Sequence, residues 1–466
     1  MMLPLIRLEF SLLLKEPRVR WIAAALCALM ALTFSISFKE ATSTAAEAAR
    51  MATVERERWL NQDPKNPHSA AHYGLWVFKP ASPLATLDPG IEPYVGRMIR
   101  IEAHRYNDAL YRSAQERSPL SRAGLSTVAD VTQLLVPLAA LLLSFATFAA
   151  DRERGTLRLA LGNGIAPGRL LLARFGALAM ATTLIVGTPA LVLGAVSIAA
   201  LDAEGWHAWP RLALWTLAQA SYAVFFLLIG LLASLVARTS RAALTIGLLC
   251  WVVLCIVIPR LTTAAIESAA PTPSYAATRA KIEEQIKLYN RADLHQERQE
   301  AIIKRYGVAN AAELPIDLRG AMMHDREQHD YSVFDRELGA FFARLSHQDD
   351  LQGWAGLASP LLAVQAASAG LAGSDFRRHS DFLRAAENYR RVLSDTMNLD
   401  LVDHPTQGGV AYLAARDVWE KVPAFVYRPA PLFQSLREVA TPLSLLAIWL
   451  ALAAVTVSLA ARGVKP

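Results

Sequence analysis

The chain has 466 residues, 53% of them hydrophobic and 19% charged, and its mean hydropathy is +0.26. This composition excludes an ordinary soluble protein of that length, because the apolar residues are gathered in long continuous runs. The net charge of +6 does not indicate a nucleic-acid groove, since Lys and Arg collect in short segments beside those runs. We therefore expect no nucleic-acid partner.

Six apolar runs predict membrane-spanning helices, because a helix needs about 20 mostly apolar residues to cross a bilayer. None of the runs contains Asp, Glu, Lys, Arg or His. Barrel strands would be about 10 residues long and alternating. The runs cover residues 21–38, 131–150, 175–201, 212–237, 242–258 and 439–461.

The first 20 residues combine four basic side chains with apolar residues at helical spacing. This pattern predicts an amphipathic helix on the inner membrane surface, which Pro17 ends before the first span. The first apolar run is longer than the 7–15 residues, roughly, of a secretory signal. We expect a retained anchor rather than a cleaved signal peptide.

Two long polar segments separate the spans. In the first, we expect helix over 40–60, irregular proline-rich chain over 61–93 and helix again over 94–118. A tight turn is expected over 202–211. The second segment, 259–438, favours helix over 275–305, 316–349 and 375–398. We interpret 352–373 as a buried or interfacial helix, because Gly, Ser and Pro interrupt its apolar character.

The predicted fold is an all-α membrane protein with six transmembrane helices and a mostly helical extracytoplasmic domain formed by the loops after helices 1 and 5. Its divisions are 1–38, 39–130, 131–258, 259–438 and 439–466. The short segments 1–20, 151–174, 238–241 and 462–466 are rich in Lys and Arg, which places them inside. Both termini are then cytoplasmic, and both large loops face the periplasm or exterior of a bacterial inner membrane.

The sequence lacks the motifs of several common kinds of binding and catalytic site. There is no phosphate-binding G-x-x-x-x-G-K-[ST], no H-E-x-x-H and no Cys pair at zinc spacing. Secondary carriers generally need an ionisable residue within the membrane, and the predicted spans have none. We expect a non-enzymatic chain that takes any energy it uses from a partner.

The stretch 151–174, DRERGTLRLALGNGIAPGRLLLAR, is an arginine-rich polar island between two spans. We expect Gly155 to end the second span and Thr156 to cap a short helix over 157–161. The glycines and proline that follow predict a sharp reversal before the third span. The alternative is that the arginines only anchor the spans to lipid headgroups.

This stretch resembles the cytoplasmic loop of ABC type-2 transporter permeases, in which E-R-E-x-G-T-L precedes the third helix. RLEFSLLLKEPRVRW resembles the opening of the same family. The external segments AHYGLWVFKPASPLATLDPG, PTPSY and LASPLLAVQAASAGLAGSDFRRHSDF resemble a branch with a large extracytoplasmic domain of unknown function. Asp151 and Ala166 stand where the family more often has Glu and Ser. The resemblance implies that ATPase coupling lies on Asp151, Arg152, Glu153, Arg154, Gly155, Thr156 and Arg169.

The resemblance also implies the partners. They are a separate ABC ATPase subunit that holds ATP and Mg, a second permease subunit of the same or a paralogous chain, and membrane lipid. No cofactor would bind this chain directly. The implied function is the permease subunit of an ATP-driven transporter, with export expected. The alternative is a mechanotransmission or structural membrane protein that moves the outer domain without transporting a substrate.

Two further residue sets are ambiguous. Gln219, Ser221, Gly230 and Ser234 in the fourth span either pack helices or line a path, and packing is the favoured interpretation. The side chains that could bind a soft metal are His68, His72, His104, Met322, Met323, His324 and His329. We interpret them as solvated polar residues, because His324 and His329 lie about 140° apart on a helix, and we predict no metal site. The cysteines 27, 250 and 255 lie in spans and are expected to pack.

Overall fold

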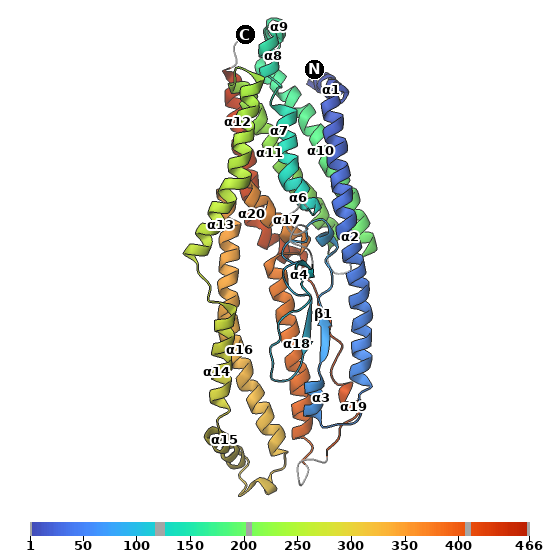
Figure 1. Ribbon diagram of the computed structural model, residues 1–466, viewed down its shortest axis with the longest axis vertical. Helices are drawn as coiled ribbons and strands as arrows, with labels where there is room; N and C mark the ends of the chain where they lie inside the picture. The colour runs from blue at the N-terminus through green and yellow to red at the C-terminus, as the bar shows by residue number, and fades with distance from the viewer. Residues whose placement is uncertain (1, 117–125, 202–206, 406–411, 464–466) are drawn as a thin grey trace.

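The computed structural model describes residues 2–116, 126–201, 207–405 and 412–463 as one elongated molecule with both chain ends at the same pole (Figure 1). Within these residues, six helices are long and apolar enough to cross a membrane. They are Pro17–Leu60, Val128–Arg154, Pro167–Ala200, Ala208–Val236, Ser240–Ala269 and Leu432–Arg462. The chain is therefore an all-α, multi-pass membrane protein, as its sequence predicts.

The membrane bundle and the short helices at its end come from three parts of the chain, residues 2–60, 128–269 and 432–462. Its elements are α1 (Met2–Lys15), α2 (Pro17–Leu60), α6 (Val128–Asp130), the π-helix η2 (Val131–Leu135), α7 (Val136–Ser144), α8 (Ala149–Arg154), α9 (Thr156–Gly162), α10 (Pro167–Ala200), α11 (Ala208–Val236), α12 (Ser240–Val252), the π-helix η3 (Val253–Val257), α13 (Ile258–Ala269) and α20 (Leu432–Arg462).

Helix α11 is the centre of the bundle. Its most apolar stretch is 67% buried, whereas that of the α12–α13 helix is only 17% buried. Tyr222, Phe225 and Phe226 of α11 are fully buried, and α11 as a whole packs against α7, α10 and α20. The outer helices keep apolar faces exposed, which suits a lipid environment.

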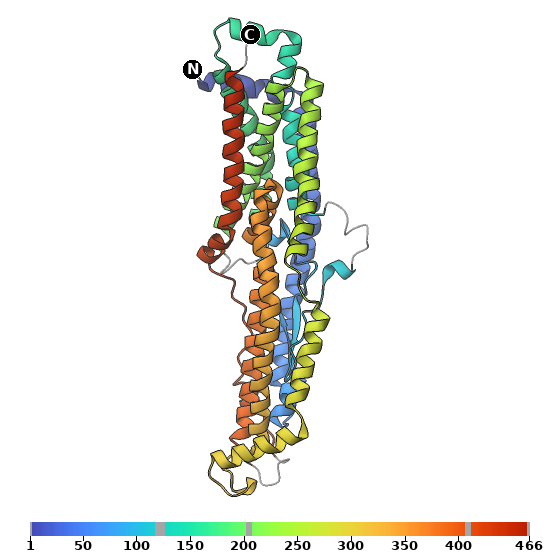
Figure 2. The same cartoon turned by 90° about the vertical axis from the view of Figure 1, so that its left-hand side faces the viewer.

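A second body, which we call the distal domain, extends from the far end of the bundle (Figure 2). Beyond the far half of α2 it contains α3 (Pro67–Tyr73), β1 (Leu75–Phe78), η1 (Pro83–Thr86), β2 (Met98–Ile101), α4 (Ser113–Glu116), α14 (Tyr275–Tyr289), α15 (Ala292–Arg305), η4 (Ala311–Glu313), α16 (Leu318–Trp354), η5 (Ala355–Leu357), α17 (Pro360–Ala372), α18 (Phe376–Val402) and α19 (Arg416–Trp419).

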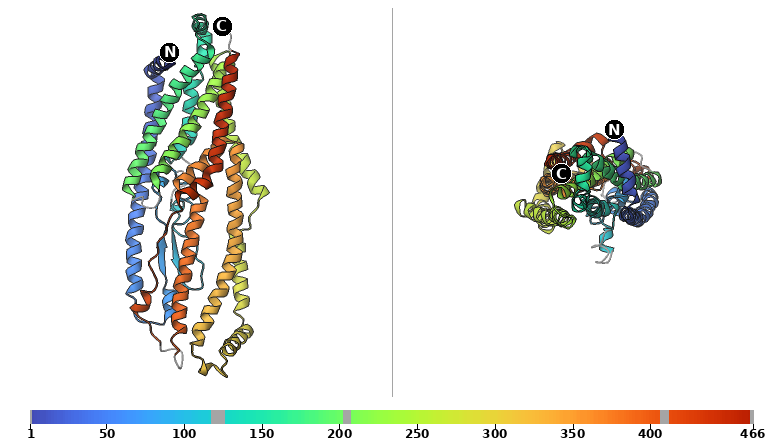
Figure 3. Two further views of the ribbon diagram at one scale, coloured as in Figure 1. Left: turned by 180° about the vertical axis from the view of Figure 1, so that it is seen from behind. Right: turned by 90° about the horizontal axis from the view of Figure 1, so that it is seen from above.

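The distal domain has a core of its own, built from both large polar segments of the sequence. Trp59 at the end of α2 and Trp419 of α19 are fully buried, and the Trp59 indole Nε1 donates to the Trp419 carbonyl oxygen at 2.9 Å. Phe382 and Met397 of α18 pack in the same cluster. The two segments therefore fold together as one domain, in which α16 and α18 run side by side and the β1–β2 pair lies between α18 and α2 (Figure 3).

Most helix predictions are confirmed. The amphipathic helix is α1, and Pro17 begins the next helix as its first residue. The first span continues without interruption through 40–60. The stretches 275–305, 316–349 and 375–398 are helical as α14 with α15, α16 and α18. The interrupted apolar stretch forms the short buried helix α17, which packs on α11 and α20 rather than crossing a membrane.

The helix predicted over 94–118 is wrong. Residues 98–101 form β2, which pairs antiparallel with β1 in the register Leu75↔Ile101 to Phe78↔Met98. Of the described part of that stretch, only 113–116 is helical. Pairing across the chain overrides helix propensity here, because Ile99 and Ile101 reach the distal core on alternate positions. Part of the turn predicted over 202–211, residues 202–206, lies outside the described residues.

Candidate functional site

Helices α8 and α9 form a hairpin that projects past the membrane helices at the pole of the chain ends (Figure 1). Helix α8 ends at Gly155, whose φ of 77° is left-handed and favours glycine. A second left-handed glycine, Gly164 at φ 82°, follows α9, and Pro167 then begins α10. The predicted short helix and reversal are therefore confirmed.

The predicted cap at Thr156 is wrong. Gly155 occupies the cap position of α9, and the Thr156 hydroxyl donates instead to the Asp151 side chain at 2.8 Å. This bond closes the α8–α9 corner from within, since it joins the first turns of the two helices. Asp151 and Thr156 thus hold the shape of the hairpin rather than the end of one helix.

Arg174 of α10 is the centre of an ionic cluster beneath the hairpin. Its guanidinium pairs with Asp151 of α8 and lies 3.4 Å from the carboxylate of Glu9 on α1. It also donates to the Thr147 carbonyl and lies over the Phe148 ring at 5.0 Å. One cation therefore links the hairpin to both α1 and α10. Charge-assisted bonds of this type are about twice as strong as neutral ones.

Arg152 joins the hairpin to the end of α11. Its guanidinium donates to the Leu235 carbonyl at 3.0 Å and the Ser234 carbonyl at 3.3 Å, and also reaches the Ala237 carbonyl. These are carbonyls of the last turn of α11, which have no partner within the helix. A cation at this terminus also matches the helix dipole. The arginine thus stabilises a helix end while it fixes α8 in place.

Glu153 joins the hairpin to the start of α12. The Ser240 amide donates to one carboxylate oxygen at 3.1 Å, and the Ser240 hydroxyl donates to the other at 2.6 Å. An anion at the first turn of a helix is favoured by the dipole. Through Arg152, Glu153 and Arg174, this small projection is connected to α1, α10, α11 and α12.

The outward face of the hairpin carries no comparable contacts among its described residues. Arg154, Arg158 and Arg169 are exposed, and Leu159 at the tip is 68% exposed. Of the predicted coupling residues, Asp151, Arg152 and Glu153 therefore contact neighbouring helices, whereas Thr156 bonds within the hairpin. Arg154 and Arg169 are exposed, and Arg154 borders a hollow that Glu9 and Arg174 also line. An apolar tip surrounded by arginines is suited to contact another protein.

The four polar or small residues of the fourth span do not come together. Gln219 and Ser234 are separated by about 22 Å along α11, at 1.5 Å per residue. Ser234 is buried, and its hydroxyl accepts the amides of Phe148 and Ala149 at 2.8 and 3.0 Å. Gly230 lies against Ser144 of α7, where a Cβ would meet the hydroxyl at 2.0 Å. Ser221 is half-buried. Helix packing accounts for Gly230 and Ser234.

Gln219 belongs to a polar chain at the other end of α11. Its amide and the Trp215 indole both donate to the Ser368 hydroxyl of α17, at 3.2 and 2.7 Å. Ser368 in turn donates to the carboxylate of Asp88. Burial raises the pKa of Asp88, and the Ser368 bond offsets part of that increase. This chain ties the central helix to the distal domain.

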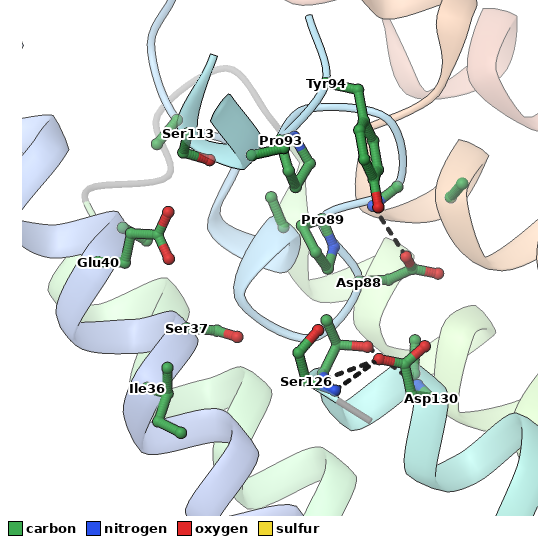
Figure 4. A pocket seen from close by; sticks show the side chains of 18 of the residues that line it. Ile36, Ser37, Glu40, Asp88, Pro89, Pro93, Tyr94, Ser113, Ser126 and Asp130 are labelled. Atoms are coloured by element: carbon green, nitrogen blue, oxygen red, sulfur yellow. Dashed lines mark hydrogen bonds between the residues drawn. The ribbon is translucent and has the colours of Figure 1, made fainter. Parts of the chain in front are cut away.

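Asp88 borders a pocket of about 340 Å³ between the bundle and the distal domain (Figure 4). Glu40 of α2 and Asp130 of α6 lie on its other sides. Two of these carboxylates bond to nearby backbone amides. Asp130 accepts the amides of Ser126 and Thr127, and Asp88 accepts that of Gly90. We therefore assign the pocket no ligand.

The histidines and methionines considered as possible soft-metal ligands do not all lie together. His329 stacks on Tyr289 at 3.6 Å between ring centres, and His324 lies 3.6 Å from the Asp395 carboxylate. Met322 and Met323 line a separate hollow near Asp317. His68, His72 and His104, by contrast, form one cluster in the distal domain.

Sequence reasoning did not single out Arg174, Glu9 or Ser240 as site residues. Arg174 closes the polar stretch 151–174, and Glu9 is the acidic residue of the N-terminal motif. Their pairing could not be inferred, because 165 residues separate them. Ser240 carried no signal beyond its place at the start of a span.

Comparison with known proteins identifies one match. Residues 276–428 match the family described as Domain of unknown function (DUF3526). The matched residues include α14, α15, α16, α17, α18 and α19, and thus most of the second polar segment. No curated protein matches the chain.

Proposed function

We propose that this chain is the membrane-spanning permease subunit of an ATP-driven ABC transporter, with export as its direction. The observation that carries the proposal is the α8–α9 hairpin. Its outer face is free for a partner, while its inner face is bonded to the membrane-spanning helices α10, α11 and α12 and to the amphipathic helix α1. A force applied to such a projection is delivered to the bundle instead of being lost in a loose loop.

The route of the force follows from the contacts. Displacing α8 pulls on Arg174 and hence on α10 and α1. The same movement acts on α11 through Arg152 and on α12 through Glu153. Because α11 is the central helix, a small rotation of the hairpin changes how the outer helices pack around it. ATP hydrolysis thus alters the bundle without any nucleotide bound to this chain.

The proposal includes the assembly and its orientation. A separate ATPase subunit holds ATP and Mg and docks on the hairpin, and a second permease subunit completes the membrane part. The hairpin and both termini face the cytoplasm of a bacterial inner membrane, and the distal domain lies outside. The enrichment of Lys and Arg in 151–174 and 238–241 supports this orientation. The chain itself catalyses no reaction.

One observation favours mechanotransmission as the second candidate. Helix α2 is continuous over 44 residues, from the first span into the distal core, a length of about 66 Å. At its far end Trp59 is bonded to Trp419, and at its near end it follows α1, which carries Glu9. A movement that starts at the hairpin can therefore reach the distal domain through one rigid helix, with no substrate.

The test is purification from native membranes. We expect an ABC ATPase, identified by mass spectrometry, to copurify with the tagged chain and to hydrolyse ATP. Leu159→Asp should abolish copurification, whereas Leu294→Asp on α15 of the distal domain should not. Retention of the ATPase by the Leu159 variant would refute docking on the hairpin. ATP hydrolysis that no exported compound stimulates, accompanied by a nucleotide-dependent change in the distal domain, would favour mechanotransmission over transport.

A further inference from the structure

Three histidines of the distal domain turn the same ring nitrogen toward one point. His68 Nε2 lies 3.1 Å from His72 Nε2 and 3.4 Å from His104 Nε2. The three candidate ligand atoms all lie within 4.8 Å of one another. Zn²⁺ bound to imidazoles at about 2.0–2.1 Å with tetrahedral angles requires nitrogens about 3.3–3.4 Å apart. The distances from His68 to His72 and from His68 to His104 match that requirement closely.

The backbone holds the three rings in place. His68 and His72 are four residues apart on α3, so their side chains share one face. Helix α3 begins at Pro67, and the Asn66 side chain caps it by accepting the His68 amide at 3.0 Å. His104 follows β2 with a left-handed φ of 60°, which is uncommon outside glycine. The Ala103 amide donates to the Ala71 carbonyl and holds that turn against α3.

Buried groups orient two of the rings from behind. His104 Nδ1 lies 2.7 Å from a carboxylate oxygen of Glu327 on α16, and Glu327 is fully buried. His68 Nδ1 lies 3.2 Å from Oδ1 of Asn398 on α18, which is also fully buried. A carboxylate and an amide oxygen only accept, so both Nδ1 atoms carry the proton and both Nε2 atoms present lone pairs. Histidine ligands of metals generally have such partners on the other nitrogen.

Two lone pairs that face each other at 3.4 Å repel, and a cation between them removes the repulsion. We propose that His68, His72 and His104 bind one divalent transition-metal ion, with zinc as the reference ion. Imidazole donors favour Zn²⁺, Cu²⁺ or Ni²⁺ over Mg²⁺ and Ca²⁺. His72 is exposed, so the fourth coordination position opens to solvent and takes a water or an exchangeable ligand.

The ion would connect the two polar segments of the sequence. His68, His72 and His104 belong to the first, and Glu327 and Asn398 belong to the second, which includes the matched residues 276–428. Metal binding therefore stabilises the distal domain as a unit. This inference does not depend on an ATPase partner, and it can fail or succeed separately from the proposed transport function.

The experiment uses the full chain in detergent, purified through a tag without histidines, stripped with EDTA and titrated with ZnCl₂ by calorimetry. We expect one equivalent to bind and the melting temperature to rise. His72→Gln removes an exposed ring, and it should weaken binding by more than about 100-fold, because losing only an outer partner costs about 10–100-fold. The matched control, His324→Gln, should bind like the unmodified chain.

Absence of saturable binding, or equal binding by the His72 variant, would overturn the proposal. If the variant does not fold, X-ray absorption spectroscopy of the zinc-loaded unmodified chain tests whether the histidines bind the ion. The expected first shell is three nitrogens and one oxygen at about 2.0–2.1 Å. A shell of oxygens alone would mean binding to surface carboxylates and would equally overturn the site.

Discussion

Glu153 accepts two hydrogen bonds from Ser240, one from the amide at 3.1 Å and one from the hydroxyl at 2.6 Å. The two residues belong to separate membrane-spanning helices and meet at the pole of the chain ends. The first residue of α12 therefore binds the carboxylate of the hairpin. It is also exposed, so it can be altered without opening the core.

We predict that Glu153→Lys uncouples ATP hydrolysis from movement of the bundle. The substitution removes both bonds and places a cation at the start of α12, where the helix dipole disfavours it. The ATPase should still copurify, because Leu159 on the outer face is unchanged, but hydrolysis should no longer respond to exported compounds or alter the distal domain. The measurement is ATPase activity of the purified complex beside the melting temperature of the chain.

Glu297→Lys on exposed α15 is the matched control and should behave as the unmodified chain. A Glu153→Lys complex that remains fully coupled would show that this contact transmits no force. A large fall in melting temperature would instead assign Glu153 a purely structural role.

We predict that Gly230→Ala destabilises the membrane bundle. A Cβ at this position would lie 2.0 Å from the Ser144 hydroxyl and 3.1 Å from its Cβ, so the Ser144 side chain must rotate away or α7 and α11 must move apart. Overpacking of this kind costs about 1–3 kcal/mol. The added Ser144→Gly substitution should restore most of the lost melting temperature, since it reopens the same space.

Gly187→Ala provides the comparison for that experiment, because its Cβ would meet neighbours at 3.6 Å, an ordinary contact distance. Equal effects of Gly187→Ala and Gly230→Ala would contradict the assignment of Gly230 to close helix packing.

We predict that Glu92→Gln severely destabilises the distal domain. Glu92 lies 3.0 Å from the Lys79 ammonium, and both side chains are only 1% exposed. Removing one charge leaves the other buried without compensation, which costs about 3–5 kcal/mol. Replacing both residues, with Lys79→Met and Glu92→Leu, should be less harmful than Glu92→Gln alone.

The same pair has a pH signature. Burial would raise the pKa of Glu92, but Arg97 and Lys79 together lower it to about 2 from 4.5. A lowered folded-state pKa gives stability that is complete above pH 4.5 and is lost as the pH falls toward 2. Thermal melting from pH 5 to 2.5 should show this loss in the unmodified chain and in exposed Glu57→Gln, but less of it in Glu92→Gln.

The structural features that the sequence predicts correctly are those that local composition determines. Apolar runs located all six spans, because the hydrocarbon thickness sets their length. The polar stretch with Gly155 and Gly164 predicted the hairpin, since left-handed glycines are a local property. The continuation of the first span through 40–60 followed from Ala- and Glu-rich composition.

Features that depend on distant contacts were not predictable in the same way. Strand β2 exists because β1 pairs with it, and its four residues give too short a pattern to outweigh helix propensity. The histidine cluster has one local signal, the four-residue spacing of His68 and His72. His104 joins it through a turn, and its orienting partner Glu327 lies 223 residues further along the chain. No local sequence pattern predicts that Glu327 lies beside His104.

We predict that His379 makes the distal domain sensitive to mild acid. Burial is the main reason that its pKa falls from 6.5 to about 3, and the nearby Lys79 lowers it further. The unfolded chain then takes up a proton below pH 6.5 while the folded chain does not, so stability decreases as the pH falls from 6.5 toward 3. Between pH 6.5 and 5 the loss is about 2 kcal/mol, at 1.36 kcal/mol per pKa unit.

His379→Leu should therefore reduce the fall in melting temperature between pH 7 and pH 5. Metal-free His68, whose pKa burial lowers to about 4, acts in the same direction and leaves part of the effect. His295→Leu on exposed α15 should keep the full dependence. If the His379 variant loses as much stability in acid as the unmodified chain, the buried imidazole at the start of α18 is not the group that senses the proton.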